Sequence, residues 1–225
     1  MKYGKTMEGI FSSRPNRFIA EVLIDGEMKI CHVKNTGRCR ELLTDGARVI
    51  LSCADNSARK TEYDLVAVYK GDQLINIDSQ APNAVFGEWL RDGGIEGATL
   101  IKPECFYKNS RFDFYVEVGE RRIFIEVKGV TLEADGVVRF PDAPTERGTK
   151  HLRELADAVE NGYEAWVCFI IQMASCKYFT PNDQTDKRFA DTLRGAAGAG
   201  VWVRAMNCFV AENELKVIGD IPVEL

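Results

Sequence analysis

The chain has 225 residues, of which 45% are apolar and 28% charged, and its formal net charge is −5. These values are ordinary for a globular protein with one large domain or two small ones. No window approaches the roughly 18 consecutive apolar residues of a membrane span, and the N-terminus lacks the apolar core of a signal peptide. We therefore expect a cytoplasmic protein with no membrane partner.

The cysteines and histidines limit the possible metal sites. The seven cysteines are odd in number and widely scattered, and no two of them are spaced as CxxC. Most lie in apolar runs such as AWVCFII, where cysteine behaves as a small hydrophobic residue. With only His32 and His151 in the chain, we expect no disulfide framework, no zinc site and no histidine-rich metal centre.

The acidic net charge argues against a protein that holds nucleic acid by bulk positive charge. A local basic groove remains compatible with it, because basic residues cluster at three places: Arg38 and Arg40; Arg59 and Lys60; Arg147, Lys150 and Arg153. Each cluster is equally typical of a solvated face.

The first 80 residues predict an all-β unit. Runs of alternating or apolar residues separated by turn residues indicate five strands, over 17–24, 28–33, 47–54, 63–69 and 74–78. Asp25 and Gly26 form a turn that joins the first two strands into a hairpin. Five short strands of this kind are typical of a small OB-type barrel or a similar roll.

From about residue 81 the pattern changes to helices alternating with strands. We expect helices over 81–94, 146–161 and 185–197, and strands over 99–107, 112–118, 122–132, 166–173 and 200–210. Thr145 is suited to cap the second helix, and Gly162 to end it. This order predicts an α/β fold class with a mixed α+β sheet. The expected domains are residues 1–81 and 82–225, without a flexible linker.

Three polar residues carry the chemistry. Glu126 and Lys128 interrupt the apolar strand RIFIEVKGVTL and share one of its faces, and Asp113 begins the preceding strand. Burying an unpaired charge is costly, so these groups are either solvated or paired. Two carboxylates near a lysine suit a hard cation such as Mg²⁺, which could orient water against a phosphodiester. A merely polar strand face is the alternative.

The sequence also resembles known proteins. The pattern D-x(12)-E-V-K at Asp113, Glu126 and Lys128 resembles the core motif of the PD-(D/E)xK nuclease superfamily. Nearly the whole chain resembles the sugar fermentation stimulation protein family, through the segments PNRFIAEV, KNTGRC, SRFDF, YVEV to IEVKGVTL, and RFPDAPTERGTKHLREL. The resemblance implies an N-terminal OB-like barrel, a C-terminal restriction-endonuclease-like domain, and DNA as the partner.

Carried over to this sequence, the resemblance implies a site for Mg²⁺ or Mn²⁺. Its ligands would be Asp113, Glu126, the carbonyl of Val127 and Glu88, although an exposed helix glutamate is an equally ordinary explanation of Glu88. Lys128 would activate water or contact the phosphate. Phe112 stands where the superfamily has proline, which is not a ligand, so the chemistry is unaffected.

Basic residues near the start of the helix after the motif are expected to contact DNA phosphates, because helix N-termini attract anions. These are Arg147, Lys150 and His151, of which His151 could instead be a proton carrier or a packed side chain. Arg38, Arg40, Arg59 and Lys60 offer a further DNA-binding surface on the barrel.

The first functional hypothesis is a Mg²⁺- or Mn²⁺-dependent deoxyribonuclease. The second is a non-catalytic DNA-binding or regulatory protein of sugar metabolism that retains the nuclease fold. The third is an enzyme that handles RNA or nucleotides through its OB module. The strand preference, the sequence preference and the oligomeric state, including a homodimer, stay open at this stage.

Overall fold

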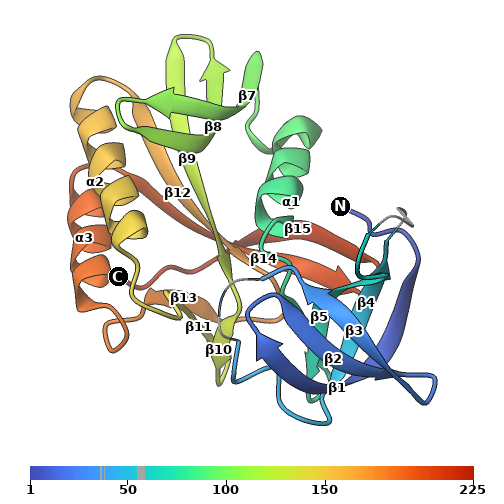
Figure 1. Cartoon of the computed structure of the whole chain (residues 1–225). Coiled ribbons are helices and arrows are strands. Elements are labelled where there is room, and N and C mark those ends of the chain that lie inside the picture. Colours follow the sequence, from blue (N-terminus) through green and yellow to red (C-terminus); the bar gives the residue numbers. More distant parts are fainter. Residues whose placement is uncertain (36, 38, 55–58) are drawn as a thin grey trace.

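Two six-stranded sheets and a smaller three-stranded sheet organise the part of the chain that the computed structural model describes, residues 1–35, 37, 39–54 and 59–225 (Figure 1). The first large sheet forms the N-terminal barrel. The second runs through the C-terminal half, with helices on both of its faces. The fold is therefore mixed α+β, as the sequence predicts.

The barrel is closed by strand pairing. Its strands are β1 (Thr6–Asn16), β2 (Ile19–Ile24), β3 (Glu27–Val33), β4 (Arg48–Cys53), β5 (Tyr63–Lys70) and β6 (Gln73–Asn76). They pair in the order β3-β2-β1-β4-β5-β6, and a parallel pairing of β3 with β5 at His32 and Val33 joins the two ends of the ring. Five strands, β1 to β5, thus form a closed OB-like barrel.

The first barrel strand, β1, was not predicted. Its sequence TMEGIFSSRPN contains Gly9, two serines and Pro15 in place of the alternating apolar residues that mark a strand. Hydrogen bonding to β2 on one side and to β4 on the other stabilises β1 as a strand, although its sequence lacks an alternating pattern. Register irregularities after Phe11 and Ser13 accommodate the poorly patterned end.

The second sheet is mixed, in the order β15-β14-β12-β9-β8-β7. The elements after the barrel are α1 (Ala81–Trp89), the π-helical turn η1 (Leu90–Gly94), β7 (Leu100–Tyr107), β8 (Ser110–Val118), β9 (Arg121–Val130), β10 (Leu132–Ala134), β11 (Val137–Phe140), α2 (Glu146–Glu160), β12 (Glu164–Ile171), β13 (Tyr178–Pro181), α3 (Lys187–Gly198), β14 (Trp202–Ala211) and β15 (Glu214–Ile221). The central strands β9, β12 and β14 are parallel, and β10, β11 and β13 form the small sheet.

Helices α2 and α3 lie side by side on one face of this sheet, and α1 lies on the other (Figure 1). Thr145 and Asp186, which cap the N-termini of α2 and α3, also link the two helices to each other. Thr145 accepts a hydrogen bond from the N–H of Gly148, and Asp186 accepts one from the N–H of Phe189 and another from the N–H of Thr145. The predicted cap at Thr145 is confirmed, and α2 is fixed at the end that approaches β9.

Several elements of the second half were also missed. The strands β10, β11 and β13 have only three or four residues each, too few to show a period. The edge strand β15 alternates polar and apolar residues as ELKVIGDI, which includes a glycine. The first helix is shorter than predicted, because η1 follows Trp89 and Gly93 has a φ of 89° there.

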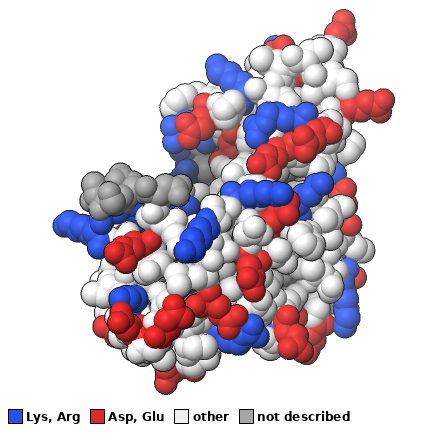
Figure 2. Space-filling model, turned by 90° about the vertical axis from the view of Figure 1, so that its right-hand side faces the viewer, with Lys and Arg blue, Asp and Glu red and all other residues white. Residues whose placement is uncertain are grey.

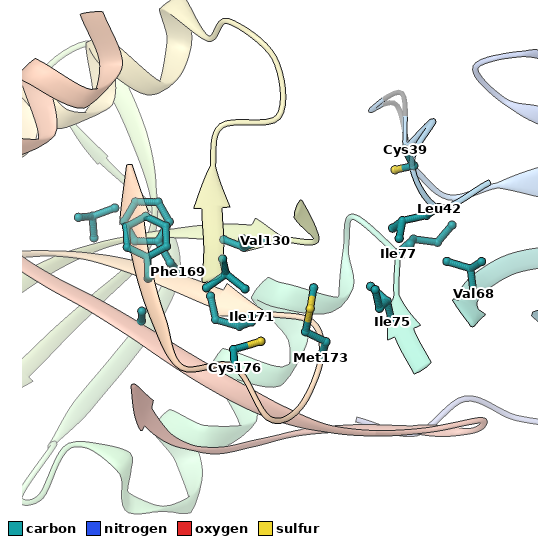
Figure 3. Close-up of a cluster of buried hydrophobic side chains, with 14 of the residues drawn as sticks. Cys39, Leu42, Val68, Ile75, Ile77, Val130, Phe169, Ile171, Met173 and Cys176 are labelled. Atoms are coloured by element: carbon teal, nitrogen blue, oxygen red, sulfur yellow. The ribbon is translucent and has the colours of Figure 1, made fainter. Parts of the chain in front are cut away.

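The barrel and the second half share one apolar core. Ile75 and Ile77 of the barrel belong to the same buried cluster as Ile171, which ends β12, and Met173, which follows it. Figure 3 shows Met173 between Ile171 and Ile75. Main-chain hydrogen bonding continues the contact, since the N–H of Asn76 donates to the carbonyl of Gln172 at 2.9 Å.

A buried ion pair fixes the start of α1 against the barrel. Asp78, whose side chain is 0% exposed, lies 2.7 Å from the ammonium of Lys34 on the barrel loop after β3. Its other carboxylate oxygen accepts a hydrogen bond from the N–H of Gln80 at 2.9 Å, and its carbonyl accepts from the side chain of Gln172. One carboxylate therefore connects the barrel, the first helix and the second sheet.

Within the described ranges, no helix is long and apolar enough to span a bilayer.

We predict that Asp78→Ala lowers the free energy of unfolding by about 3 kcal/mol, because it leaves the largely buried Lys34 without its counter-ion. Urea denaturation followed by circular dichroism measures the change. The matched control is Glu27→Ala, which breaks the exposed pair with Lys29 and should change stability little. Equal effects of the two substitutions would contradict the role of Asp78.

Candidate functional site

The candidate site lies where β8 separates from β9. The last paired residues of the two strands are Phe114 and Ile125. Beyond them Asp113 turns its carboxylate to β9, where Oδ2 accepts a hydrogen bond from the N–H of Val127 at 2.7 Å. Because the N–H and C=O of one strand residue point to the same side, the Val127 carbonyl faces the same gap. Two kinds of oxygen therefore converge at this end of the sheet.

Helix α1 supplies a second contact to the first carboxylate. The side-chain amide of Asn83 donates to Oδ1 of Asp113 at 2.6 Å. Asn83 lies in the first turn of the helix whose start is fixed by Asp78. The orientation of Asp113 thus depends on β9 and on α1 together.

The second carboxylate is in the core, below α2. Glu126 is only 3% exposed, and its Oε1 contacts both the ammonium of Lys128 and Nδ1 of His151, the latter at 2.5 Å. Nε2 of His151 accepts a long hydrogen bond of 3.5 Å from Nε of Arg147. This arrangement places the ring proton on Nδ1, so His151 donates to Glu126.

The other oxygen of Glu126 has no donor. Oε2 is buried and makes no hydrogen bond with any residue that the structure describes. A buried carboxylate oxygen without a donor is costly in a folded protein and needs an explanation. Hard divalent cations bind such oxygens, so the donor set of Asp113, Glu126 and the Val127 carbonyl fits Mg²⁺, Mn²⁺ or Ca²⁺.

The two carboxylates have opposite electrostatic environments. Burial and the nearby charge of Glu126 raise the pKa of Asp113 above its ordinary value. Burial also opposes ionisation of Glu126, but the hydrogen bond from His151 and the charge of Lys128 outweigh it and lower the pKa of Glu126. Like charges held close together are the usual cause of such a divergence, and a bound cation would relieve it.

The number of protein ligands would be small. Among residues 1–35, 37, 39–54 and 59–225, no group of three or more His, Cys, Asp and Glu side chains is arranged to hold a metal ion. Mg²⁺ is often held by only one or two carboxylates, with waters and substrate phosphate as its other ligands. The pair seen here is of that kind.

The structure places Glu88 away from this centre. Its carboxylate lies 2.5 Å from the ammonium of Met1, beside β15. Glu88 follows Asn83 by five positions, which turns it about 140° around the helix from the residue that contacts Asp113. The expected extra acid is therefore replaced at the site by Asn83. An exposed amide in a first helical turn is too common for the sequence to have singled it out.

His151 also differs from its expected DNA-binding role. It is 4% exposed, and its ring nitrogens are directed at Glu126 and Arg147, which leaves little of the ring for contact with DNA. Arg147 and Lys150 remain exposed on the first turns of α2. Lys150 donates to the carbonyl of Asn109 in the hairpin between β7 and β8. The basic face of α2 thus begins beside the carboxylates.

The predicted basic residues of the barrel are not gathered at the carboxylates. Arg59 forms a two-pronged pair with Asp64 at 2.6 and 2.9 Å, whereas Lys60 and Arg40 are exposed on barrel loops. Arg38 lies outside the described residues. On the face seen in Figure 2, basic and acidic side chains are interspersed rather than gathered in one broad basic patch.

Comparison with known proteins covers almost the whole chain. The model of the SfsA N-terminal OB domain matches residues 13–77, and that of the sugar fermentation stimulation protein RE domain matches residues 80–214. The sugar fermentation stimulation protein homolog of Desulfitobacterium hafniense (strain DSM 10664 / DCB-2) is 58% identical over 225 residues, covering 100% of this chain and 99% of the relative. That of Clostridium beijerinckii is 55% identical over 218 residues, covering 96% of each chain.

A solved structure also resembles the whole chain. It is the structure of Pyrococcus furiosus SfsA in complex with Ca²⁺, with a TM-score of 0.91 and 28% sequence identity. The match covers 100% of this chain and 98% of the other.

We predict opposite effects of removing the two charges at pH 7 in the absence of divalent cations. Because the pKa of Asp113 is raised in the folded state, its ionisation opposes folding once the pH has risen through that pKa. Asp113→Asn should therefore stabilise the protein. Glu126→Gln should destabilise it by about 2 kcal/mol, because Lys128 loses its counter-charge and His151 loses a charged hydrogen-bond acceptor.

Urea denaturation in EDTA tests this contrast, with the exposed Asp45→Asn as the control. A loss of stability in Asp113→Asn as large as that in Glu126→Gln would show that the repulsion between the carboxylates is not significant.

Proposed function

Because this chain belongs to the sugar fermentation stimulation protein family, we propose that it binds DNA and hydrolyses phosphodiester bonds with the help of Mg²⁺ or Mn²⁺. One observation carries the proposal. Asp113, Glu126 and Lys128 come together where β8 leaves β9, and Oε2 of Glu126 is buried without a donor among the described residues. A purely structural ion pair would not require a second acid beside it. This arrangement supports the resemblance of these residues to the PD-(D/E)xK nuclease motif.

The cation would be held by one oxygen each from Asp113, Glu126 and the Val127 carbonyl. All three are hard ligands of the type that Mg²⁺, Mn²⁺ and Ca²⁺ share. The Pyrococcus furiosus relative, whose structure is in complex with Ca²⁺, supports a hard-cation site in this fold. Asn83 and His151 would act as positioning residues, since each orients one of the carboxylates.

When bound, the cation polarises the phosphate and lowers the pKa of a bound water. The attacking water oxygen would form a bond to phosphorus while the bond to the leaving oxygen breaks, and the proton lost by the water would pass through solvent to the leaving oxygen. Lys128, held beside Glu126 by their ion pair, would stabilise the negative charge that grows on the phosphoryl oxygens. Its position on the same strand face as Glu126 keeps the ammonium at the reacting group.

DNA would be oriented by the exposed first turns of α2. Arg147 reaches the site through its contact with His151, and Lys150 lies one residue before His151 on the same helix. The positive end of the helix dipole adds to their attraction for phosphate. Such contacts position the backbone without reading its sequence. A few local cations are compatible with a net charge of −5.

We predict that Asp113→Ala and Glu126→Ala each abolish Mn²⁺ binding and DNA cleavage together. Lys128→Ala should still bind the metal, because the cation itself supplies a counter-charge to Glu126. It should cleave at least about 100-fold more slowly, because the positive charge beside the phosphate is lost. Calorimetric titration with Mn²⁺ measures binding. Incubation with supercoiled, linear and single-stranded DNA measures cleavage.

Glu88→Gln is the control and should leave both measurements unchanged, because Glu88 pairs with Met1. Wild-type protein that binds Mn²⁺ and DNA without cleaving would instead be a non-catalytic DNA-binding protein. If the wild-type protein binds no metal, the two carboxylates are only part of a polar strand face.

We predict that Arg147→Ala and Lys150→Ala each reduce the slope of log binding constant against log salt concentration by about 0.9 for duplex DNA. Each substitution removes one phosphate contact and should weaken all sequences alike. Fluorescence anisotropy at several salt concentrations measures the slope. Arg188→Ala, an exposed site on α3, should leave it unchanged. Equal slopes in all variants would place the DNA elsewhere.

A further inference from the structure

A polar cavity, which we call the junction cavity, lies where the barrel meets the second half of the chain. Its volume is about 260 Å³. The barrel side contributes Asn35 and Gly37 from the loop after β3. The other side consists of the chain over residues 129–132, together with Arg139 and Asp142 from the end of β11 and the loop after it.

The junction cavity adjoins the metal centre. Gly129, which lines it, directly follows Lys128 on β9. Ser79, at the opposite wall, precedes the helix whose first turn carries Asn83. The same strand and the same helix therefore border both sites. A nucleic-acid strand with one phosphate at Lys128 would present a neighbouring nucleotide to the junction cavity.

The barrel wall of the cavity is firmly held. Arg14 donates to the carbonyls of Gly37 at 2.8 Å and Asn35 at 2.6 Å. The side chain of Asn35 donates to the carbonyl of Ile77 at 2.8 Å and accepts from the N–H of Gly37 at 2.7 Å. These bonds hold Asn35 and Gly37 against the barrel.

The opposite wall is held equally firmly. A Cβ on Gly129 would lie 2.5 Å from Oε1 of the buried Gln172, so only glycine fits there. Gln172 in turn donates to the side chain of Asn76 and to the carbonyl of Asp78. A Cβ on Gly37 would come within 3.2 Å of Oδ2 of Asp142, which shows how closely the two walls approach.

Two oppositely charged side chains, those of Arg139 and Asp142, line the junction cavity. Within the described part of the chain neither side chain makes a hydrogen bond or an ion pair, although the charge of Arg139 acts on the nearby Glu133. A free phosphate would meet repulsion from Asp142. A ligand that both accepts and donates hydrogen bonds satisfies the two groups at once, and the edge of a nucleobase does this.

From these observations we propose that the junction cavity binds an unpaired nucleobase adjacent to the phosphodiester at the metal centre. Arg139 donates to a carbonyl or ring nitrogen of the base, and Asp142 accepts from an amino or imino group. In a duplex the hydrogen-bonding edge of the base is already paired, so the base enters from a single strand or is turned out of a duplex. This inference rests on the proposed nuclease function and adds a substrate preference to it.

The test compares two fluorescein-labelled strands of equal length in Ca²⁺, a normal single-stranded DNA and one with abasic sugars throughout. We expect wild-type protein to bind the normal strand about tenfold more tightly, as one good base contact implies. Arg139→Ala, Asp142→Ala and Asp142→Asn should lose this preference. Arg188→Ala and Glu88→Gln should keep it, because neither residue lines the cavity or takes part in the metal site.

The outcomes separate the base site from the nuclease. Equal weakening of both strands in Arg139→Ala, with no effect of Asp142→Ala, would mean a phosphate contact and would overturn the base site. Variants that keep the wild-type preference would also overturn it, even if Mn²⁺-dependent cleavage is present. If the wild-type protein shows the preference but does not cleave DNA, and the Arg139 and Asp142 variants lose the preference, the base site is upheld and the nuclease proposal fails.

Discussion

The close approach of two carboxylates, one of them in the protein core, is the constraint on which the second half of the molecule depends. Glu126 stays charged there only because Lys128 and His151 contact the same oxygen. Lys128 belongs to β9 and His151 to α2, so the helix must lie against this strand. Its capping by Thr145, and the link from Thr145 to Asp186, secure that position. The packing of α2 against β9 thus also provides the contacts that keep Glu126 charged.

The barrel contributes to the same geometry from the other side of the sheet. Asp78 joins the barrel loop at Lys34 to the first turn of α1, and that turn carries the amide that orients Asp113. The distance between the two carboxylates is therefore set by elements from both halves of the chain. This explains why no flexible segment separates the halves. A mobile barrel would allow Asp113 to turn away from Glu126.

Much of this was predictable from the sequence, and the failures have physical causes. The apolar run around Glu126 and Lys128 marks both the strand and the charges that need partners. Strands such as β1, where tertiary pairing compensates for glycine and serine, show no periodic signal. Asn83 and the role of His151 depend on which helix face approaches the sheet, and spacing along the chain does not specify that. The contact of Glu88 with Met1 is equally non-local.

The continuous apolar core has a consequence for whether the two halves can be separated. Ile75, Ile77 and Met173 would be exposed to water if either half were expressed alone, so neither half is a module that can be exchanged freely. Domains that are stable on their own are usually joined by exposed linkers that few contacts cross. Here residues inserted between the two halves would separate the buried side chains that they share, so the halves depend on each other for stability.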